Sequence, residues 1–195
     1  RQGVTAGNVV GANGPLSSPR MPEFPGIERF AGESFHTAQW DSKAKLSGKR
    51  VGIIGTGASA AQVITAIVDD VESLHVFQRT PTWCMRREDE PTPSRIKEKF
   101  RAGGYGEKLR TVDWKGELPP PDPDDVFLEI DWEALHDEAQ NEAICAELRK
   151  LITHDVKDPE LAKRLTPDYP FFCKRVLFID DYYTTFNKPH VTLVD

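Results

Sequence analysis

The sequence predicts an α/β fold in which a doubly wound parallel sheet is interrupted by a helical insertion. A short apolar run at 50–54 is bounded by glycines, which suits a strand buried on both faces of a parallel sheet. Apolar residues recur at helical spacing from Ala61 to Val68, and a second strand is expected at 74–78. A strand, a helix and a strand within about 30 residues form one βαβ unit. The run at 190–194 resumes the sheet pattern.

The other segments predict a linker and an insertion around this unit. Residues 1–46 are rich in proline and contain a strand-like pair, Val9-Val10, so we expect a linker and the remnant of a preceding domain. Residues 47–195 are expected to form a nucleotide-binding domain with a helical insertion at about 91–170. After Pro81 the sheet pattern is expected to stop for about ninety residues. The chain starts at Arg1 without methionine and ends on a strand-like run, so we expect a fragment of a larger protein.

Three segments of the expected insertion carry sequence signals that predict helices. Residues 94–100 can start a helix with Ser94 as its cap, and a longer apolar face runs from about Asp131 to Ile152. Asp158-Pro159 combines an N-cap residue with proline in the first helical position, which predicts a third helix that ends before Pro167.

Composition excludes several classes of protein. The 195 residues are 38% hydrophobic, carry a net charge of −6 and include no run near the roughly 18 apolar residues of a membrane span. There is no basic stripe with interleaved aromatics, so no nucleic-acid partner is expected. The three cysteines form no Cys-x-x-Cys motif, which indicates neither a disulfide framework nor a metal site. A soluble, cytoplasmic protein is expected.

The turn between the first strand and helix carries a G-x-G-x-x-A motif at 55–60. Gly55 permits a tight turn, Gly57 allows a pyrophosphate to approach the backbone, and the small Ala60 lets helix and strand pack closely. This arrangement is typical of a Rossmann-like dinucleotide site, although an ordinary glycine turn remains the alternative. The candidate cofactor-binding residues here are Gly55, Thr56, Gly57, Ala58, Ser59, Ala60 and Gln62.

The end of the second strand indicates which dinucleotide binds. An NAD or FAD site places Asp or Glu there to accept hydrogen bonds from ribose hydroxyls. This chain has Gln78-Arg79-Thr80 instead. The Arg79 guanidinium can pair with a 2′-phosphate and Thr80 can add a hydroxyl, so NADPH is favoured; the alternative is a solvated surface arginine.

A third motif lies in the linker and leads to a family resemblance. Phe30, Gly32, His36, Trp40 and Asp41 follow the pattern F-x-G-x-x-x-H-x-x-x-W-[P/D], which resembles the fingerprint of flavin-dependent Baeyer–Villiger monooxygenases. The resemblance implies that His36 acts in conformational coupling between domains and is not a proton carrier.

The resemblance extends over nearly the whole chain. The segment 14–26 resembles the family's return from the FAD domain, 76–81 its NADPH-specificity strand, and 168–187 the segment after its helical insertion. The runs 58–60 and 167–170 are most similar to the 4-hydroxyacetophenone monooxygenase branch. The chain is thereby expected to be part of a flavoprotein with two dinucleotide-binding domains, and its FAD would be bound mainly by parts outside this sequence.

The resemblance also implies an activity. In the family, NADPH reduces FAD, the flavin reacts with O₂, and one oxygen atom is inserted next to a ketone carbonyl to give an ester or lactone. Arg175 would be the catalytic residue that stabilises the developing negative charge, and Lys174 would contact the 2′-phosphate beside Arg79. Alone, the chain is expected to be inactive. The alternatives are an N- or S-oxygenating flavin-containing monooxygenase and a non-catalytic NADPH-binding module.

Overall fold

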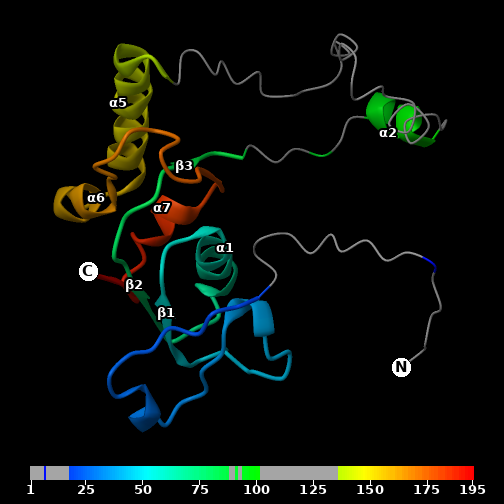
Figure 1. Cartoon of the computed structure of the whole chain (residues 1–195), viewed down its shortest axis with the longest axis vertical. Coiled ribbons are helices and arrows are strands. Elements are labelled where there is room, and N and C mark those ends of the chain that lie inside the picture. The colour runs from blue at the N-terminus through cyan, green and yellow to red at the C-terminus, as the bar shows by residue number, and fades with distance from the viewer. Residues whose placement is uncertain (1–6, 8–17, 88–90, 92–93, 102–135) are drawn as a thin grey trace.

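The computed structural model describes residue 7 and residues 18–87, 91, 94–101 and 136–195 (Figure 1). The strand expected at Val9-Val10 and the resemblance at 14–17 lie outside the described residues, as does the expected helix start at Asp131. Among the residues described, no helix is both long and apolar enough to cross a membrane.

The main sheet is parallel, as the sequence predicts. Its strands are β1 (Arg50–Ile54), β2 (Ser73–Phe77) and β5 (Val191–Val194), in the order β1-β2-β5. Helix α1 (Ala58–Ile67) joins β1 to β2 and completes the predicted βαβ unit. The register pairs Ile54 with Phe77 and Phe77 with Val194, so all three strands end at the same edge. This carboxyl edge is where parallel sheets place their ligand-binding turns.

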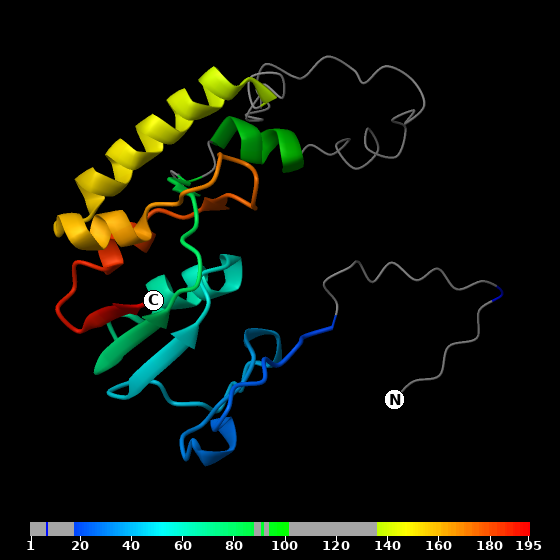
Figure 2. The same ribbon diagram turned by 60° about the vertical axis from the view of Figure 1, so that its left-hand side comes forward.

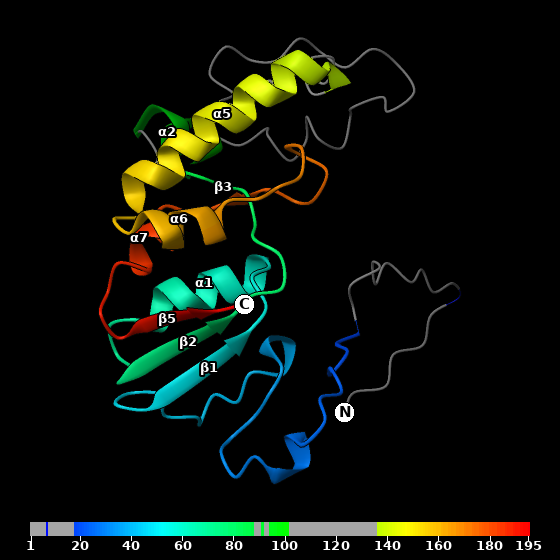
Figure 3. The same cartoon turned by 90° about the vertical axis from the view of Figure 1, so that its left-hand side faces the viewer.

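The described helices that cover this sheet lie on one of its faces. Helices α1 and α7 (Tyr182–Thr185) pack over the sheet, with α6 (Pro159–Leu165) and α5 (Glu138–Asp155) stacked beyond them (Figures 2 and 3). The opposite face is open within the described residues: Ile54 is 59% exposed and Phe77 is 41% exposed. The expectation that β1 is buried on both faces is therefore wrong here, because no described helix covers the second face.

A second, small sheet corrects the expectation that the sheet pattern stops after Pro81. Strand β3 (Cys84–Met85) pairs in parallel with β4 (Leu177–Phe178). The backbone N–H of Leu177 donates to the carbonyl of Trp83 at 3.0 Å, and that of Ile179 to Met85 at 2.9 Å. A strand of two residues is too short to show the alternation of polar and apolar residues that identifies a strand. The sequence pattern therefore did not predict β3 or β4.

Helices α5 and α6 begin at side-chain caps. Helix α2 covers Ser94–Arg101, close to the predicted range. Helix α5 begins at Glu138, where the Asp137 carboxylate accepts a hydrogen bond from the Gln140 amide at 2.8 Å. Asp158 caps α6 by accepting from the amides of Glu160 and Leu161, as its sequence predicts. The helix ends at Leu165, before Pro167.

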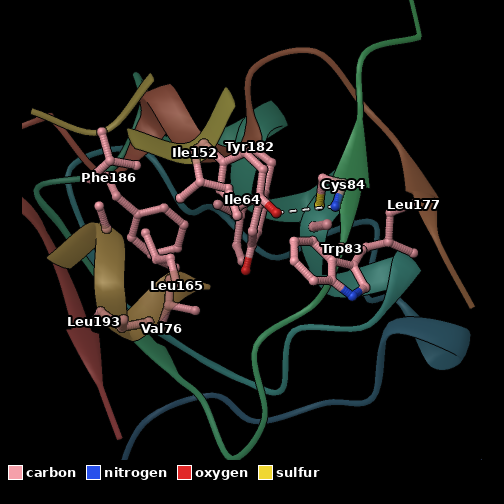
Figure 4. Packing of buried hydrophobic residues seen from close by; sticks show 14 of the residues in the cluster. Ile64, Val76, Trp83, Cys84, Ile152, Leu165, Leu177, Tyr182, Phe186 and Leu193 are labelled. Atoms are coloured by element: carbon pink, nitrogen blue, oxygen red, sulfur yellow. Dashed lines mark hydrogen bonds between the residues drawn. The ribbon is translucent and has the colours of Figure 1, made fainter. Parts of the chain in front are cut away.

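The core joins the sheet and helices α1, α5, α6 and α7 into one cluster (Figure 4). Ile64 of α1, Val76 of β2 and Tyr182 of α7 are each no more than 1% exposed. Ile152 of α5 and Leu165 of α6 pack into the same cluster, and Trp83 and Cys84 extend it toward β3. Burial of aliphatic and aromatic side chains is the main force that holds these layers together.

Segment 18–49 runs beyond β1, at the edge of the main sheet (Figure 3). Its described secondary structure consists of two short 3₁₀ helices, η1 (Ile27–Arg29) and η2 (Thr37–Gln39). The amide of Gly48 donates to the Asp70 carbonyl at 2.8 Å, which attaches the end of the segment to the turn before β2.

Candidate dinucleotide site

The glycine turn follows β1 at the carboxyl edge of the sheet. Gly55 has a φ of +102°, in a region that favours glycine, and its amide donates to the Phe77 carbonyl at 2.8 Å. Gly57 is the N-cap residue of α1 and has no side chain to occupy the helix's free amides. Nothing lies within 4 Å of the position that a Cβ would take at either glycine. The turn is therefore an open cradle that fits a pyrophosphate at a helix N-terminus.

Thr56 connects this turn to the end of β2. Its side chain is buried, and Oγ1 donates to the Thr80 carbonyl at 2.9 Å. The hydrogen bond fixes the glycine turn next to Arg79-Thr80. Thr56 and Thr80, both predicted to contact the ligand, are thus also hydrogen-bonded to each other.

Two of the remaining predicted residues are exposed around the turn. Arg79 is exposed at the carboxyl end of β2, directly after the buried Gln78. Gln62 is exposed on α1, and its Nε2 donates to the Ala58 carbonyl at 3.1 Å. Arg79 is thus available to an anion at this edge, while Gln62 is engaged by its own helix.

Tyr169 brings Lys174 to the same region. The Lys174 ammonium lies 4.3 Å from the centroid of the Tyr169 ring, a cation–π contact. The Tyr169 hydroxyl donates to the Pro81 carbonyl at 3.0 Å, and the Tyr169 carbonyl accepts from Trp83 Nε1 at 3.0 Å. Lys174 is therefore attached, through one ring, to the segment that follows Arg79 and Thr80. No local sequence signal marks Tyr169 as this link, because the contact spans 88 residues.

A second missed residue, Asn141, holds the loop that leads to Lys174 and Arg175. Asn141 is buried in α5; its Nδ2 donates to the Phe171 carbonyl at 3.1 Å, and its Oδ1 accepts from the Phe171 amide at 3.0 Å. The Asn141 side chain thus provides hydrogen-bond partners for both the amide and the carbonyl of Phe171. Phe172, next in the chain, has a φ of +67°, which costs about 1–2 kcal/mol for a residue with a Cβ. Arg175 is exposed at the end of this loop.

The linker motif forms its own local structure. The Phe30 ring packs over Gly32, where an added Cβ would lie 2.6 Å from the ring. His36 Nδ1 accepts from the Ala38 amide at 3.0 Å and caps η2, while Trp40 meets Phe35 edge to face. The Asp41 carboxylate accepts from the Lys43 amide at 2.8 Å. In the part of the chain that the structure describes, no hydrogen bond joins this motif to the glycine turn.

Burial strongly perturbs the titratable groups at β3. Burial raises the pKa of the Cys84 thiol to about 12, although a hydrogen bond with Tyr183 partly opposes the shift. The Tyr183 hydroxyl accepts from the Cys84 amide at 3.1 Å and donates to the Thr82 carbonyl at 2.9 Å. Burial also raises the pKa of Tyr182 and of Tyr183 well above their usual range. These groups are neutral at physiological pH, so they act as structural groups.

The parallel sheet and the glycine turn together are typical of a nucleotide-binding fold. A parallel α/β unit with an open glycine-rich βα turn at its carboxyl edge is the Rossmann type of nucleotide-binding fold. A family model described as flavin-binding monooxygenase-like matches residues 4–99.

Individual proteins are similar to this chain over nearly its whole length. A Baeyer–Villiger monooxygenase of Streptomyces coelicolor is 38% identical over 98% of this chain and 35% of its own length. The structure of OTEMO in complex with FAD and NADP matches with a TM-score of 0.76 and 34% identity, over 94% of this chain and 40% of that one. Cyclohexanone monooxygenase from Rhodococcus sp. Phi1, bound to NADP+, matches with a TM-score of 0.73 and 32% identity, over 94% and 39%.

Over nearly its whole length the chain is therefore similar to flavin monooxygenases of the Baeyer–Villiger and FMO-like type, as the linker motif and glycine turn indicated. It spans about two fifths of the length of the relatives that it matches.

Proposed function

We propose that this chain is the NADPH-binding part of a Baeyer–Villiger monooxygenase that inserts one oxygen atom of O₂ next to a ketone carbonyl. The observation that carries the proposal is the set of contacts linking the glycine turn, Arg79-Thr80 and Lys174. Thr56 binds the Thr80 carbonyl, and Tyr169 binds the Pro81 carbonyl while its ring supports the Lys174 ammonium.

Within this proposal, the glycine turn holds the pyrophosphate and the cations hold the 2′-phosphate. The amides at the start of α1 (Ala58, Ser59 and Ala60) donate toward the phosphates, and Gly57 permits close approach. Arg79 supplies a fixed fork of donors and Lys174 a mobile point charge, a combination suited to a phosphate monoester. Thr80 adds a hydroxyl.

Arg175 is proposed to act at the reaction centre. When bound, FAD supplies the chemistry of oxygen activation, with NADPH as the source of electrons. The chain's own contribution is a permanently charged guanidinium, placed by the Asn141-anchored loop, that stabilises negative charge on the ketone oxygen. The proposed roles of Phe30, Gly32, His36, Trp40 and Asp41 are conformational, since their described contacts are local.

Calorimetric titration of the purified chain tests the cofactor proposal. NADPH is expected to bind and NADH to bind more weakly, and the chain alone is expected to retain no FAD and to oxygenate no ketone. Retention of FAD, or ketone turnover with NADPH, would contradict the proposal that the flavin site lies mainly outside this sequence. Absence of NADPH binding would contradict the proposed site itself.

The alternatives are separated by the product of the longer protein. An ester or lactone from a ketone supports the Baeyer–Villiger reaction, whereas oxidation of amines and sulfides alone supports the N- or S-oxygenating alternative. The runs 58–60 and 167–170 support the proposal that the longer protein belongs to the 4-hydroxyacetophenone monooxygenase branch. A non-catalytic NADPH-binding module predicts that NADPH binds but that the longer protein forms no product from a ketone.

A further inference from the structure

A carboxylate lies at the edge of the sheet where the 2′-phosphate is proposed to bind. Gln78, which is only 8% exposed, donates from Nε2 to Asp195 Oδ1 at 3.2 Å and to the Arg164 carbonyl at 2.9 Å. Arg164 Nε lies 2.5 Å from Asp195 Oδ2, and its Nη2 donates to the Leu193 carbonyl at 2.9 Å. Both oxygens of the Asp195 carboxylate are therefore engaged, one by an amide and one by a guanidinium.

The Asp195 carboxylate lies next to the end of β2, where a dinucleotide fold distinguishes its cofactors. Strands β2 and β5 are parallel neighbours, and the Gln78 amide donates to the Val194 carbonyl at 2.7 Å. Gln78 and Asp195 thus follow the ends of adjacent strands, and Arg79 is the next residue after Gln78. An acid at the end of the second strand of a dinucleotide fold accepts from the ribose hydroxyls and repels a 2′-phosphate. Here that strand ends in glutamine, but β5 supplies a carboxylate to the same edge.

We infer that Arg164 is a specificity-determining residue because it neutralises Asp195 and so keeps this edge open to the 2′-phosphate. Arg164 touches neither the nucleotide nor the reacting atoms; it acts through Asp195. The inference rests on the proposed NADPH site.

Stability alone gives a weak reason for the pair. The side chains of Arg164 and Asp195 are 42% and 44% exposed, and exposed ion pairs add little to folding stability. An uncompensated carboxylate, in contrast, acts on a phosphate across the Debye length of about 8 Å at physiological salt. The Asp195 carboxylate contacts Gln78, the residue immediately before Arg79. Its negative charge therefore acts close to Arg79, where the preference for NADP+ over NAD+ is proposed to be set.

Two single substitutions break the same pair with opposite effects on charge. Arg164→Gln leaves the carboxylate uncompensated, and Asp195→Asn leaves the guanidinium uncompensated. Arg164→Lys retains the positive charge, and the double variant Arg164→Gln/Asp195→Asn removes both charges. NADP+ and NAD+ are the probes because they differ only in the 2′-phosphate, and calorimetry at low salt gives the ratio of their dissociation constants. Circular dichroism and thermal unfolding check that each variant is folded.

If Arg164 acts by neutralising the charge of Asp195, the two single substitutions are expected to affect the preference for NADP+ differently. Arg164→Gln is expected to reduce the preference for NADP+ about threefold to tenfold, the size expected for one unscreened surface charge near a phosphate. Asp195→Asn is expected to maintain or increase that preference. The double variant and Arg164→Lys are expected to stay near the parent value, and 0.5 M salt is expected to reduce all differences.

Three results overturn the inference. If both single variants lower the preference by the same factor, the pair acts through structure and not through charge, while the proposed NADPH site stands. If the preference is unchanged in Arg164→Gln, Asp195 does not influence the 2′-phosphate. If the unsubstituted chain has no preference for NADP+, the proposed function itself fails, and the inference fails with it.

Discussion

The ammonium of Lys174 lies 4.3 Å from the centre of the Tyr169 ring, and the hydroxyl of that ring donates to the Pro81 carbonyl. One aromatic side chain thereby joins the loop that carries Lys174 and Arg175 to the segment that carries Arg79 and Thr80. Residues nearly a hundred positions apart in the chain thus become neighbours in the proposed site.

Substitution of Tyr169 separates the two functions of its side chain. Tyr169→Phe retains the ring and removes the hydrogen bond to Pro81, so we expect NADPH affinity to fall about twofold to fivefold, the effect of one neutral hydrogen bond. Tyr169→Leu removes the ring as well and is expected to lower the affinity about tenfold or more. NADH affinity measured on the same variants is the control: an equal loss for NADH would contradict a role through Lys174.

Arg79→Ala tests the proposed 2′-phosphate contact. Loss of a charge-assisted contact costs about 1.5–3 kcal/mol, so we expect NADPH to bind about 10- to 100-fold more weakly. NADH affinity is expected to change little. Arg50→Ala is the matched control, because Arg50 is also exposed but lies at the amino end of β1, the opposite edge of the same sheet. If Arg79→Ala and Arg50→Ala lower the NADPH affinity equally, Arg79 acts through general electrostatic attraction and not through a contact with the 2′-phosphate.

The two glycines of the turn are expected to respond differently to alanine. At Gly57 the backbone has a φ of −75° and an added Cβ meets nothing within 4 Å, so Gly57→Ala is expected to leave the free energy of unfolding within about 1 kcal/mol. Its methyl group would occupy the cradle, so NADPH binding is expected to be lost. Gly55→Ala is expected to lower the free energy of unfolding by about 1 kcal/mol or more, because its φ is +102°. Denaturant titration and calorimetry measure the two effects separately.

Asn141 is expected to be important for stability and, through its loop, for ligand binding. Asn141→Ala leaves the buried amide and carbonyl of Phe171 without their partners, which costs about 2–4 kcal/mol. Gln140→Ala, at the exposed neighbouring position, is the control and is expected to change stability by less than about 0.5 kcal/mol. Similar losses in both variants would contradict a specific role for Asn141.

Stability is expected to decline in mild alkali because of Cys84. Burial raises the pKa of Cys84 in the folded state to about 12, while an unfolded thiol titrates near about 8.5. The stabilisation is therefore fully present below about pH 8.5 and is lost as pH rises toward 12, with about 1 kcal/mol lost between pH 8 and 9.5. Cys84→Ala is expected to remove this dependence, whereas Cys173→Ala, at an exposed cysteine, is expected to preserve it. Unfolding titrations over this pH range measure the slopes.

The local signals of the sequence predicted the βαβ unit and the start of α6 well. The apolar run at 50–54, the glycine turn and the strand expected at 74–78 depend on short-range preferences, which a sequence shows directly. The Asp158 cap is equally local. In contrast, the two-residue strands β3 and β4 exist only because each pairs with the other, so their sequences contain no independent signal.

By itself the sequence determined the class of fold and the candidate ligand-binding residues, because glycine spacing, strand length and charge at the end of β2 are properties of neighbouring residues. The tertiary structure decided which residues meet. It placed Tyr169 between Lys174 and Pro81, Asn141 on the loop before Arg175, and Arg164 on the carboxylate of Asp195. Such contacts depend on how layers pack, and packing depends on the whole chain.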